Sequence, residues 1–209
     1  MEIFLDNISR KYNHEWVFRN LSFTFSSGNS CAVLGPNGSG KSTLLQIISG
    51  HLHPTGGTVQ YRLNGSMLPD EQIFRYIAIT APYIELIEEF TLPEMISFHL
   101  KFRNLRHGMD VKEFMDILDI GSNRDKCLKY FSSGMKQRVK LALAILSDVP
   151  VLLLDEPATN LDASGVAWYR GLVAEHCADR IAVICSNSQP AECDFCHTSL
   201  LVENYKGTR

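Results

Sequence analysis

Residues 35–42 have the types and the spacing that bind phosphate groups. They read Gly-Pro-Asn-Gly-Ser-Gly-Lys-Ser, which matches the pattern G-x-x-x-x-G-K-[ST] between a predicted strand and a predicted helix. Glycines let backbone N–H groups approach phosphate oxygens closely, and the helix that follows adds the positive end of its dipole. We expect Lys41 to contact the β- and γ-phosphates of a nucleotide and the Ser42 hydroxyl to be a ligand of Mg²⁺. The residues predicted to contact the nucleotide in this stretch are Gly35, Pro36, Asn37, Gly38, Ser39, Gly40, Lys41, Ser42 and Thr43.

Two carboxylates, Asp155 and Glu156, follow the apolar run at residues 151–154. A buried parallel strand would deliver Asp155 to the carboxyl edge of a sheet, which is where open α/β sheets bind ligands. At that edge Asp155 can hold Mg²⁺ through water, and Glu156 can orient and deprotonate an attacking water. An apolar run that ends in Asp-Glu is a weak pattern by itself. Together with the glycine-rich stretch it predicts a hydrolytic site in which Lys41 and Glu156 are catalytic.

A third motif, Phe-Ser-Ser-Gly-Met-Lys-Gln-Arg at residues 131–138, stands just before a predicted helix. Ser132 can cap that helix, and the Gly134 amide would lie at its positive end. An ordinary helix cap explains the same residues. If the motif does contact a phosphate, it cannot easily reach the nucleotide held by the glycine-rich stretch of its own chain. A second subunit would then be required.

The apolar pattern predicts the elements that must position these motifs. Strands are predicted near the N-terminus and over residues 30–34, 58–63, 76–80, 151–154 and 180–185. Helices are predicted over residues 42–49, 134–146 and 164–176. Because strands and helices alternate, we expect a parallel sheet with helices on its faces. Apolar residues at helical spacing in the middle of the chain predict a helical insert over roughly residues 83–132.

The composition is that of one α/β domain spanning residues 1–209, with 45% hydrophobic and 21% charged residues. A net charge of −3 gives no global basic field, so no nucleic-acid partner is expected. The first residues lack the basic and apolar regions of a secretory signal, and the apolar runs are far shorter than the ~20 residues of a membrane span. We therefore expect a cytoplasmic protein that meets a membrane only through a partner.

The chain has six cysteines, at positions 31, 127, 177, 185, 193 and 196, and the last two belong to the pattern C-x-x-C-H. Cys193, Cys196 and His197 make up this pattern, which is also that of haem attachment. Without an export signal, the interpretation that we favour is a loop that enters the last strand. The other cysteines are expected to be small buried apolar residues in a reducing compartment.

In their order along the chain these motifs resemble the nucleotide-binding domain of the ABC ATPase family, and the resemblance covers nearly the whole chain. GPNGSGKST corresponds to the family's Walker A loop, FSSGMKQR to its signature loop, VLLLDEP to its Walker B strand and residues 158–162 to its D-loop. Tyr12 matches the family's adenine-stacking aromatic residue. The resemblance implies an α/β P-loop NTPase with a RecA-like parallel-sheet core, an N-terminal antiparallel β subdomain and the helical insert.

The resemblance also implies a function, cofactors and partners. In the family two domains pair head to tail and hold two ATP molecules, so Ser132 and Gly134 would contact the ATP of the opposite domain. ATP and Mg²⁺ are the implied cofactors. The implied partners are a second ABC ATPase domain, in a homodimer, and a separate transmembrane permease at the inner face of the cell membrane. Residues 83–90 match the region that meets the permease, although a helix with a solvated acidic face explains their pattern equally well.

Two positions depart from the family pattern. Pro82 occupies the place of the usual glutamine, and proline offers neither a side-chain ligand nor a backbone donor. Asn187 occupies the place of the switch histidine; its amide can donate a hydrogen bond to a γ-phosphate oxygen but cannot carry a proton. The site is therefore either slow and regulatory, or still hydrolytic. We favour hydrolysis, because loop amides, metal and signature donors stabilise most of the transition-state charge.

Three classes of function remain to be separated. The leading one is the energy-coupling ATPase subunit of an ABC transporter. The second is an ABC ATPase that serves cofactor assembly or another cytosolic machine, although the coiled-coil inserts and basic extensions common in that class are not seen in the sequence. The third is a P-loop kinase or small GTPase, which the signature loop and the lack of an N-K-x-D motif argue against.

Overall fold

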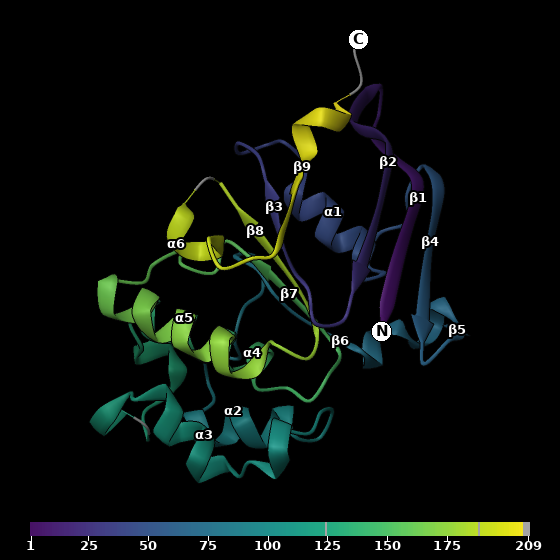
Figure 1. Cartoon of the computed structure of the whole chain (residues 1–209). Helices are drawn as coiled ribbons and strands as arrows, with labels where there is room; N and C mark the ends of the chain where they lie inside the picture. The colour runs from purple at the N-terminus through teal and green to yellow at the C-terminus, as the bar shows by residue number, and fades with distance from the viewer. Residues whose placement is uncertain (124, 188, 207–209) are drawn as a thin grey trace.

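The computed structural model describes residues 1–123, 125–187 and 189–206, and its elements form two sheets with helices between and around them (Figure 1). The first sheet is antiparallel, with the strand order β2-β1-β4-β5. Its strands are β1 (Glu2–Tyr12), β2 (Glu15–Ser26), β4 (Gly56–Leu63) and β5 (Ser66–Leu68). This sheet is the antiparallel subdomain that the family resemblance implies.

The second sheet is parallel and has the order β6-β7-β8-β3-β9. Its strands are β3 (Ser30–Leu34), β6 (Ile77–Thr80), β7 (Val151–Asp155), β8 (Ile181–Ser186) and β9 (Thr198–Leu201). The parallel sheet predicted from the alternation of strands and helices is therefore confirmed. Every residue of β7 and β8 is buried, as expected of strands that are covered on both faces.

Successive side chains of β7 pack into two different cores, because strand side chains point alternately to opposite faces. Val151 and Leu153 pack with α1 (Lys41–Ile48) and the antiparallel sheet. Leu152 and Leu154 pack on the other face with α4 (Ser133–Ile145) and α5 (Ala163–His176). Figure 1 shows this layering, with α1 between the two sheets. Both faces of β7 are thus fixed by apolar packing, which makes its end a rigid support.

Among its described residues the helical insert has two α-helices, α2 (Leu92–His99) and α3 (Val111–Leu118), which lie at one end of the molecule (Figure 1). Each begins with a reciprocal cap: the Glu94 carboxylate accepts from the Thr91 N–H at 2.8 Å, and Asp110 and Glu113 are paired in the same way. Residues 83–90 are turns and irregular backbone with no helix, so the helix with an acidic face considered for them is wrong. No helix among the described residues is long and apolar enough to cross a membrane.

Four strands of the parallel sheet deliver the predicted site residues to one edge. The glycine-rich loop follows β3, Asp155 ends β7, Asn187 follows β8, and Pro82 comes two residues after β6. Because parallel strands have their carboxyl ends at the same edge, these residues share one side of the sheet. The short helix α6 (Pro190–Cys193) then leads into β9.

Candidate active site

The glycine-rich loop between β3 and α1 has a backbone that only glycine fits at two of its positions. Gly40, the cap of α1, has φ of 103°, and a Cβ there would lie 2.4 Å from Val17 Cγ1 of β2. Gly35 has φ of 152°, and a Cβ there would lie 2.6 Å from Ser39 Oγ. Both values of φ lie outside the range that L residues adopt comfortably. The glycines therefore let the loop turn tightly into the N-terminus of α1, which is where a phosphate cradle is built.

The Lys41 side chain is held inside this loop. It is 5% exposed, and its Nζ donates to the carbonyl oxygens of Gly35 at 2.7 Å and Pro36 at 3.2 Å. A buried ammonium needs such partners, because taking the charge from water is costly. Among the other predicted loop residues, Pro36, Asn37 and Gly38 are exposed, Ser39 is buried and Thr43 is half-buried.

Asp155 is a buried carboxylate with a free oxygen beside Ser42. It is 3% exposed, and its Oδ1 has no hydrogen-bond partner among the described residues. Burial raises the pKa of this carboxyl; hydrogen bonding with Ser42 and the charge of Lys41 lower it, and Glu156 raises it. A hydroxyl and a carboxylate oxygen are hard ligands of the kind that Mg²⁺ takes together with phosphates. The donor set therefore fits Mg²⁺, and the role of Ser42 and Asp155 as its ligands stays a prediction.

Glu156 takes an uncommon backbone conformation at the end of β7. Its φ is 48°, in the left-handed region, and its N–H donates to Cys185 O of β8 at 3.0 Å. A residue other than glycine rarely adopts this conformation, and such residues cluster at functional sites. The turn takes the chain out of the sheet immediately after Asp155, and the Glu156 side chain is half-buried.

The structure brings Asn187 to the glycine-rich loop, as its predicted role requires. Its Nδ2 donates to Asn37 Oδ1 at 3.5 Å, a contact between residues 150 positions apart. Pro82 is exposed. The neighbouring Tyr83 was not predicted, yet it lies at the same edge. Burial raises the pKa of its phenol, a hydrogen bond with Gln46 of α1 lowers it, and the charge of Asp155 raises it.

Tyr12 lies at the end of β1 and is 46% exposed. It lines a cavity of about 500 Å³ together with Trp16, Gly38 and Lys206. The Arg10 guanidinium lies over its ring, 4.6 Å from the ring centroid. An exposed aromatic ring beside the phosphate cradle can stack on a nucleobase, which is the role that was predicted for Tyr12.

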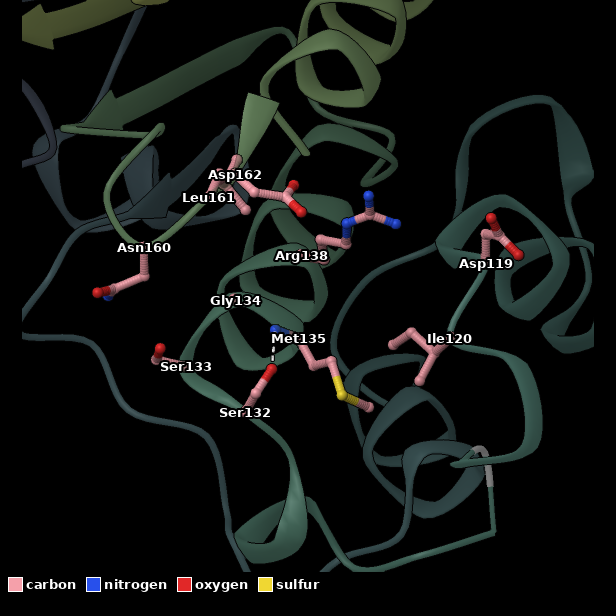
Figure 2. A pocket seen from close by; sticks show the side chains of 10 residues that line it. All are labelled: Asp119, Ile120, Ser132, Ser133, Gly134, Met135, Arg138, Asn160, Leu161 and Asp162. Carbon is pink, nitrogen blue, oxygen red and sulfur yellow. Dashed lines mark hydrogen bonds between the residues drawn. The ribbon is translucent and has the colours of Figure 1, made fainter. Parts of the chain in front are cut away.

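Ser132 and Gly134 line a different cavity, of about 400 Å³, at the start of α4 (Figure 2). Ser132 Oγ accepts from the Met135 N–H at 3.2 Å, so the predicted cap is present. Asn160 and Asp162 of the D-loop line the same cavity. None of the residues that line it belongs to the glycine-rich loop. As expected, the signature loop therefore faces a surface of its own.

The C-x-x-C-H segment connects α6 to β9, as the favoured interpretation predicted. The His197 ring nitrogen Nδ1 lies 3.0 Å from Ser30 Oγ and 3.2 Å from the Ser30 nitrogen, at the start of β3. Burial raises the pKa of the Cys196 thiol to about 12. The described residues contain no group of three or more His, Cys, Asp and Glu side chains that could hold a metal ion.

Comparisons with known proteins agree with this geometry. The model of a family described as ABC transporter matches residues 18–159. The cytochrome c biogenesis ATP-binding export protein CcmA of Brucella abortus (strain 2308) is 30% identical over 194 residues, covering 93% of this chain and 88% of that protein.

Two solved structures share the fold. A Pyrococcus furiosus protein described as an ABC transporter ATP-binding protein has a TM-score of 0.83 at 23% identity, and the alignment covers 99% of this chain and all of that one. The dimeric bacterial ABC transporter cassette MJ0796 has a TM-score of 0.78 at 24% identity, covering 96% and 94% of the two chains. The chain belongs to the ABC transporter family and is one of its ATP-binding, ATP-hydrolysing nucleotide-binding domains.

Proposed function

We propose that this chain is the energy-coupling subunit of a membrane transporter and works as a head-to-tail dimer around two Mg-ATP. The observation that carries the proposal is the division of the site over two surfaces. Lys41, Asp155 and Glu156 lie at one edge of the sheet, whereas Ser132 and Gly134 line a separate cavity with the D-loop. Each chain thus carries two complementary halves. The solved cassette MJ0796, which shares this fold, is dimeric.

Each half has a chemical task in this proposal. The loop amides and Lys41 hold the β- and γ-phosphates, and Tyr12 stacks on the adenine. The Ser42 hydroxyl and the Asp155 carboxylate hold Mg²⁺, which neutralises charge on the phosphates when bound. Glu156 orients and deprotonates the attacking water, and Asn187 donates a hydrogen bond to a γ-phosphate oxygen.

The partner's signature loop completes each site. In it the Ser132 hydroxyl and the Gly134 amide, at the positive end of α4, face the γ-phosphate. These donors act from the opposite chain, so they contribute only once two chains have closed on ATP. Dimer formation and hydrolysis are therefore expected to depend on residues 132–134, whereas the first binding of Mg-ATP by a single chain is not.

Replacing Gly134 by alanine tests this division directly. A Cβ at Gly134 would lie 2.9 Å from the Asn160 carbonyl oxygen, so the signature loop must shift away from the D-loop. We expect ATPase activity to fall by roughly tenfold or more, since small displacements at a phosphate site are costly. The affinity of one chain for Mg-ATP is expected to stay within about twofold of wild type, because Lys41 and Asp155 are untouched.

Gly171→Ala is the matched control, since it makes the same change in α5, where an added Cβ meets nothing within 4 Å. It should leave both quantities unchanged. Steady-state phosphate release and titration with a fluorescent ATP analogue measure the two quantities. Equal loss of ATP affinity and ATPase activity in Gly134→Ala would contradict the two-surface arrangement.

The permease partner is tested by recovery from membranes. We expect the tagged chain to be peripheral at the inner face of the cell membrane, and to bring down a polytopic membrane protein after extraction with mild detergent. Residues 83–90 are expected at that contact, and Glu85 is an exposed member of the segment. A cross-linker placed by Glu85→Cys should reach the membrane protein. Recovery of the chain from the soluble fraction only, with no membrane protein bound, would contradict the transporter role.

A further inference from the structure

Glu192 is a buried carboxylate beside the active site that the sequence motifs do not include. It lies on α6 and is 1% exposed. Its Oε1 accepts from the Ala158 N–H at 3.0 Å, and its Oε2 accepts from the Ser186 hydroxyl at 2.5 Å. Each carboxylate oxygen therefore has a donor, which offsets the cost of burying the charge.

The two donors belong to the two segments that carry proposed catalytic groups. Ala158 comes two residues after Glu156, at the start of the D-loop, and Ser186 immediately precedes Asn187. Their hydrogen bonds to one carboxyl join residues 34 and 6 positions away from Glu192 along the chain. The end of β7 and the end of β8 are thus tied together outside the sheet, beyond their last backbone pairing.

The Glu192 backbone and the D-loop are also held from the helices behind them. The Tyr169 hydroxyl of α5 donates to Glu192 O at 3.0 Å. On the other side, Gln137 Nε2 of α4 donates to Pro157 O at 2.9 Å. Helix α4 begins in the signature loop, so the backbone between Glu156 and the D-loop is fixed both by that helix and by Glu192. The carboxyl is consequently not free to move by itself.

The acidic groups of the site lie close enough to influence each other. Burial raises the pKa of the Glu192 carboxyl, and the hydrogen bonds from Ser186 and Ala158 lower it. The charges of Glu156 and Asp155 raise it further. Because the Ala158 N–H donates to this carboxyl, loss of the carboxyl would leave that N–H without its acceptor. The segment next to the catalytic carboxylates would then be held less firmly.

We propose that Glu192 is a positioning residue for ATP hydrolysis, which holds the backbone after Glu156 and the segment bearing Asn187 in a fixed relation. Without it the D-loop and the end of β8 can move apart. The water held by Glu156 is then no longer aligned for attack on the γ-phosphate that Asn187 contacts. A displacement of about 1 Å between reacting groups can cost on the order of 100-fold in rate. ATP binding depends on the glycine-rich loop, which Glu192 does not touch. The inference rests on the roles proposed for Glu156 and Asn187.

The test compares three variants of the full chain by steady-state phosphate release. Glu192→Ala is expected to lower kcat by roughly tenfold or more and to leave KM for ATP within about threefold of wild type. Glu192→Gln keeps an acceptor for the Ala158 N–H and gains an amide donor toward Ser186 Oγ, so kcat should return to within about threefold of wild type. Glu175→Ala is the matched control: it removes a carboxylate at an exposed position of α5, so kcat and KM should both stay at the wild-type values.

Three results would overturn the proposal. They are an unchanged kcat in Glu192→Ala, a loss of kcat in Glu192→Gln as large as in Glu192→Ala, and a loss of kcat in Glu175→Ala as large as in Glu192→Ala. If Glu192→Ala does not fold, Ser186→Ala removes one of the two ties, and a kcat equal to wild type in that variant would reject the role of Glu192. Glu156→Gln in the same assay distinguishes failure of the proposed function from failure of this inference. Full activity in Glu156→Gln contradicts the role of Glu156. A loss of kcat in Glu156→Gln together with an unchanged kcat in Glu192→Ala contradicts only the role of Glu192.

Discussion

Glu156→Gln is expected to lower kcat for ATP hydrolysis by roughly 100-fold or more, which is the usual contribution of a general base. The amide keeps the size of the side chain and can still hold water, but it cannot accept the proton. KM for ATP should change little, because the phosphate contacts of Lys41 and the loop amides are retained. A fall of 100-fold corresponds to about 2.7 kcal/mol of transition-state stabilisation.

The position of Glu156 explains why this effect should be large. The residue follows Asp155 directly, in a left-handed conformation that the Cys185 carbonyl secures. Glutamine can adopt the same backbone, so the substitution changes the chemistry more than the fold. Glu175→Gln, the same change at an exposed position of α5, is the control. Equal rates for Glu156→Gln and wild type would remove Glu156 from the mechanism.

A second consequence is expected for the same variant. A chain that binds Mg-ATP but cannot hydrolyse it should remain in the closed dimer, because the bound ATP keeps contacting both chains. Light scattering of Glu156→Gln should show a dimer when Mg-ATP is present and a monomer when ATP is removed. The double variant with Gly134→Ala should stay monomeric at the same ATP concentration.

Lys41→Ala is expected to weaken Mg-ATP binding by on the order of 100-fold, because the ammonium makes charge-assisted contacts to two phosphates, each with a net value of about 1.5–3 kcal/mol. ATP at 100 times the wild-type dissociation constant stabilises the wild-type fold by about 2.7 kcal/mol, and that gain should nearly vanish in the variant. The measurement is the change in Tm on addition of Mg-ATP.

Lys41→Ala also leaves the Gly35 and Pro36 carbonyls without their donor, so its own Tm without ATP is expected to fall. The comparison must therefore be the shift that ATP causes, not the absolute Tm. Lys112→Ala, at an exposed position of α3, is the control for loss of a positive charge. A wild-type shift in Lys41→Ala would contradict the proposed phosphate contact.

The parts of the fold that the sequence predicts are those that local patterns encode. The glycine-rich loop is recognisable because its glycines adopt backbone conformations that other residues avoid, such as the φ of 103° at Gly40. The strand at residues 151–154 is recognisable because a strand buried on both faces must be apolar throughout. The pattern did not show that residues 58–63 and 76–80 belong to different sheets, since both are short half-apolar runs.

The site residues that sequence reasoning missed depend on contacts between distant parts of the chain. Glu192 sits in a four-residue helix with no motif, and only the fold brings it to Ala158. Tyr83 directly follows Pro82, the residue that departs from the family pattern. The sequence does contain one signal for Tyr83. Gln46 lies four residues after Ser42, so the two share one face of α1, and the Gln46 amide requires a hydrogen-bond partner on that face.

Lys41, Ser42 and Asp155 are proposed to form one pocket that binds ATP with its metal. Calorimetric titration of ATP into the wild-type chain, with and without Mg²⁺, measures this most directly. We predict saturable binding with one ATP per chain, strengthened by Mg²⁺, and no such strengthening in Asp155→Asn, which removes the carboxylate. ATP binding with the same affinity in wild type and Asp155→Asn at every Mg²⁺ concentration, or no binding by wild type at all, would contradict a shared pocket for ATP and Mg²⁺.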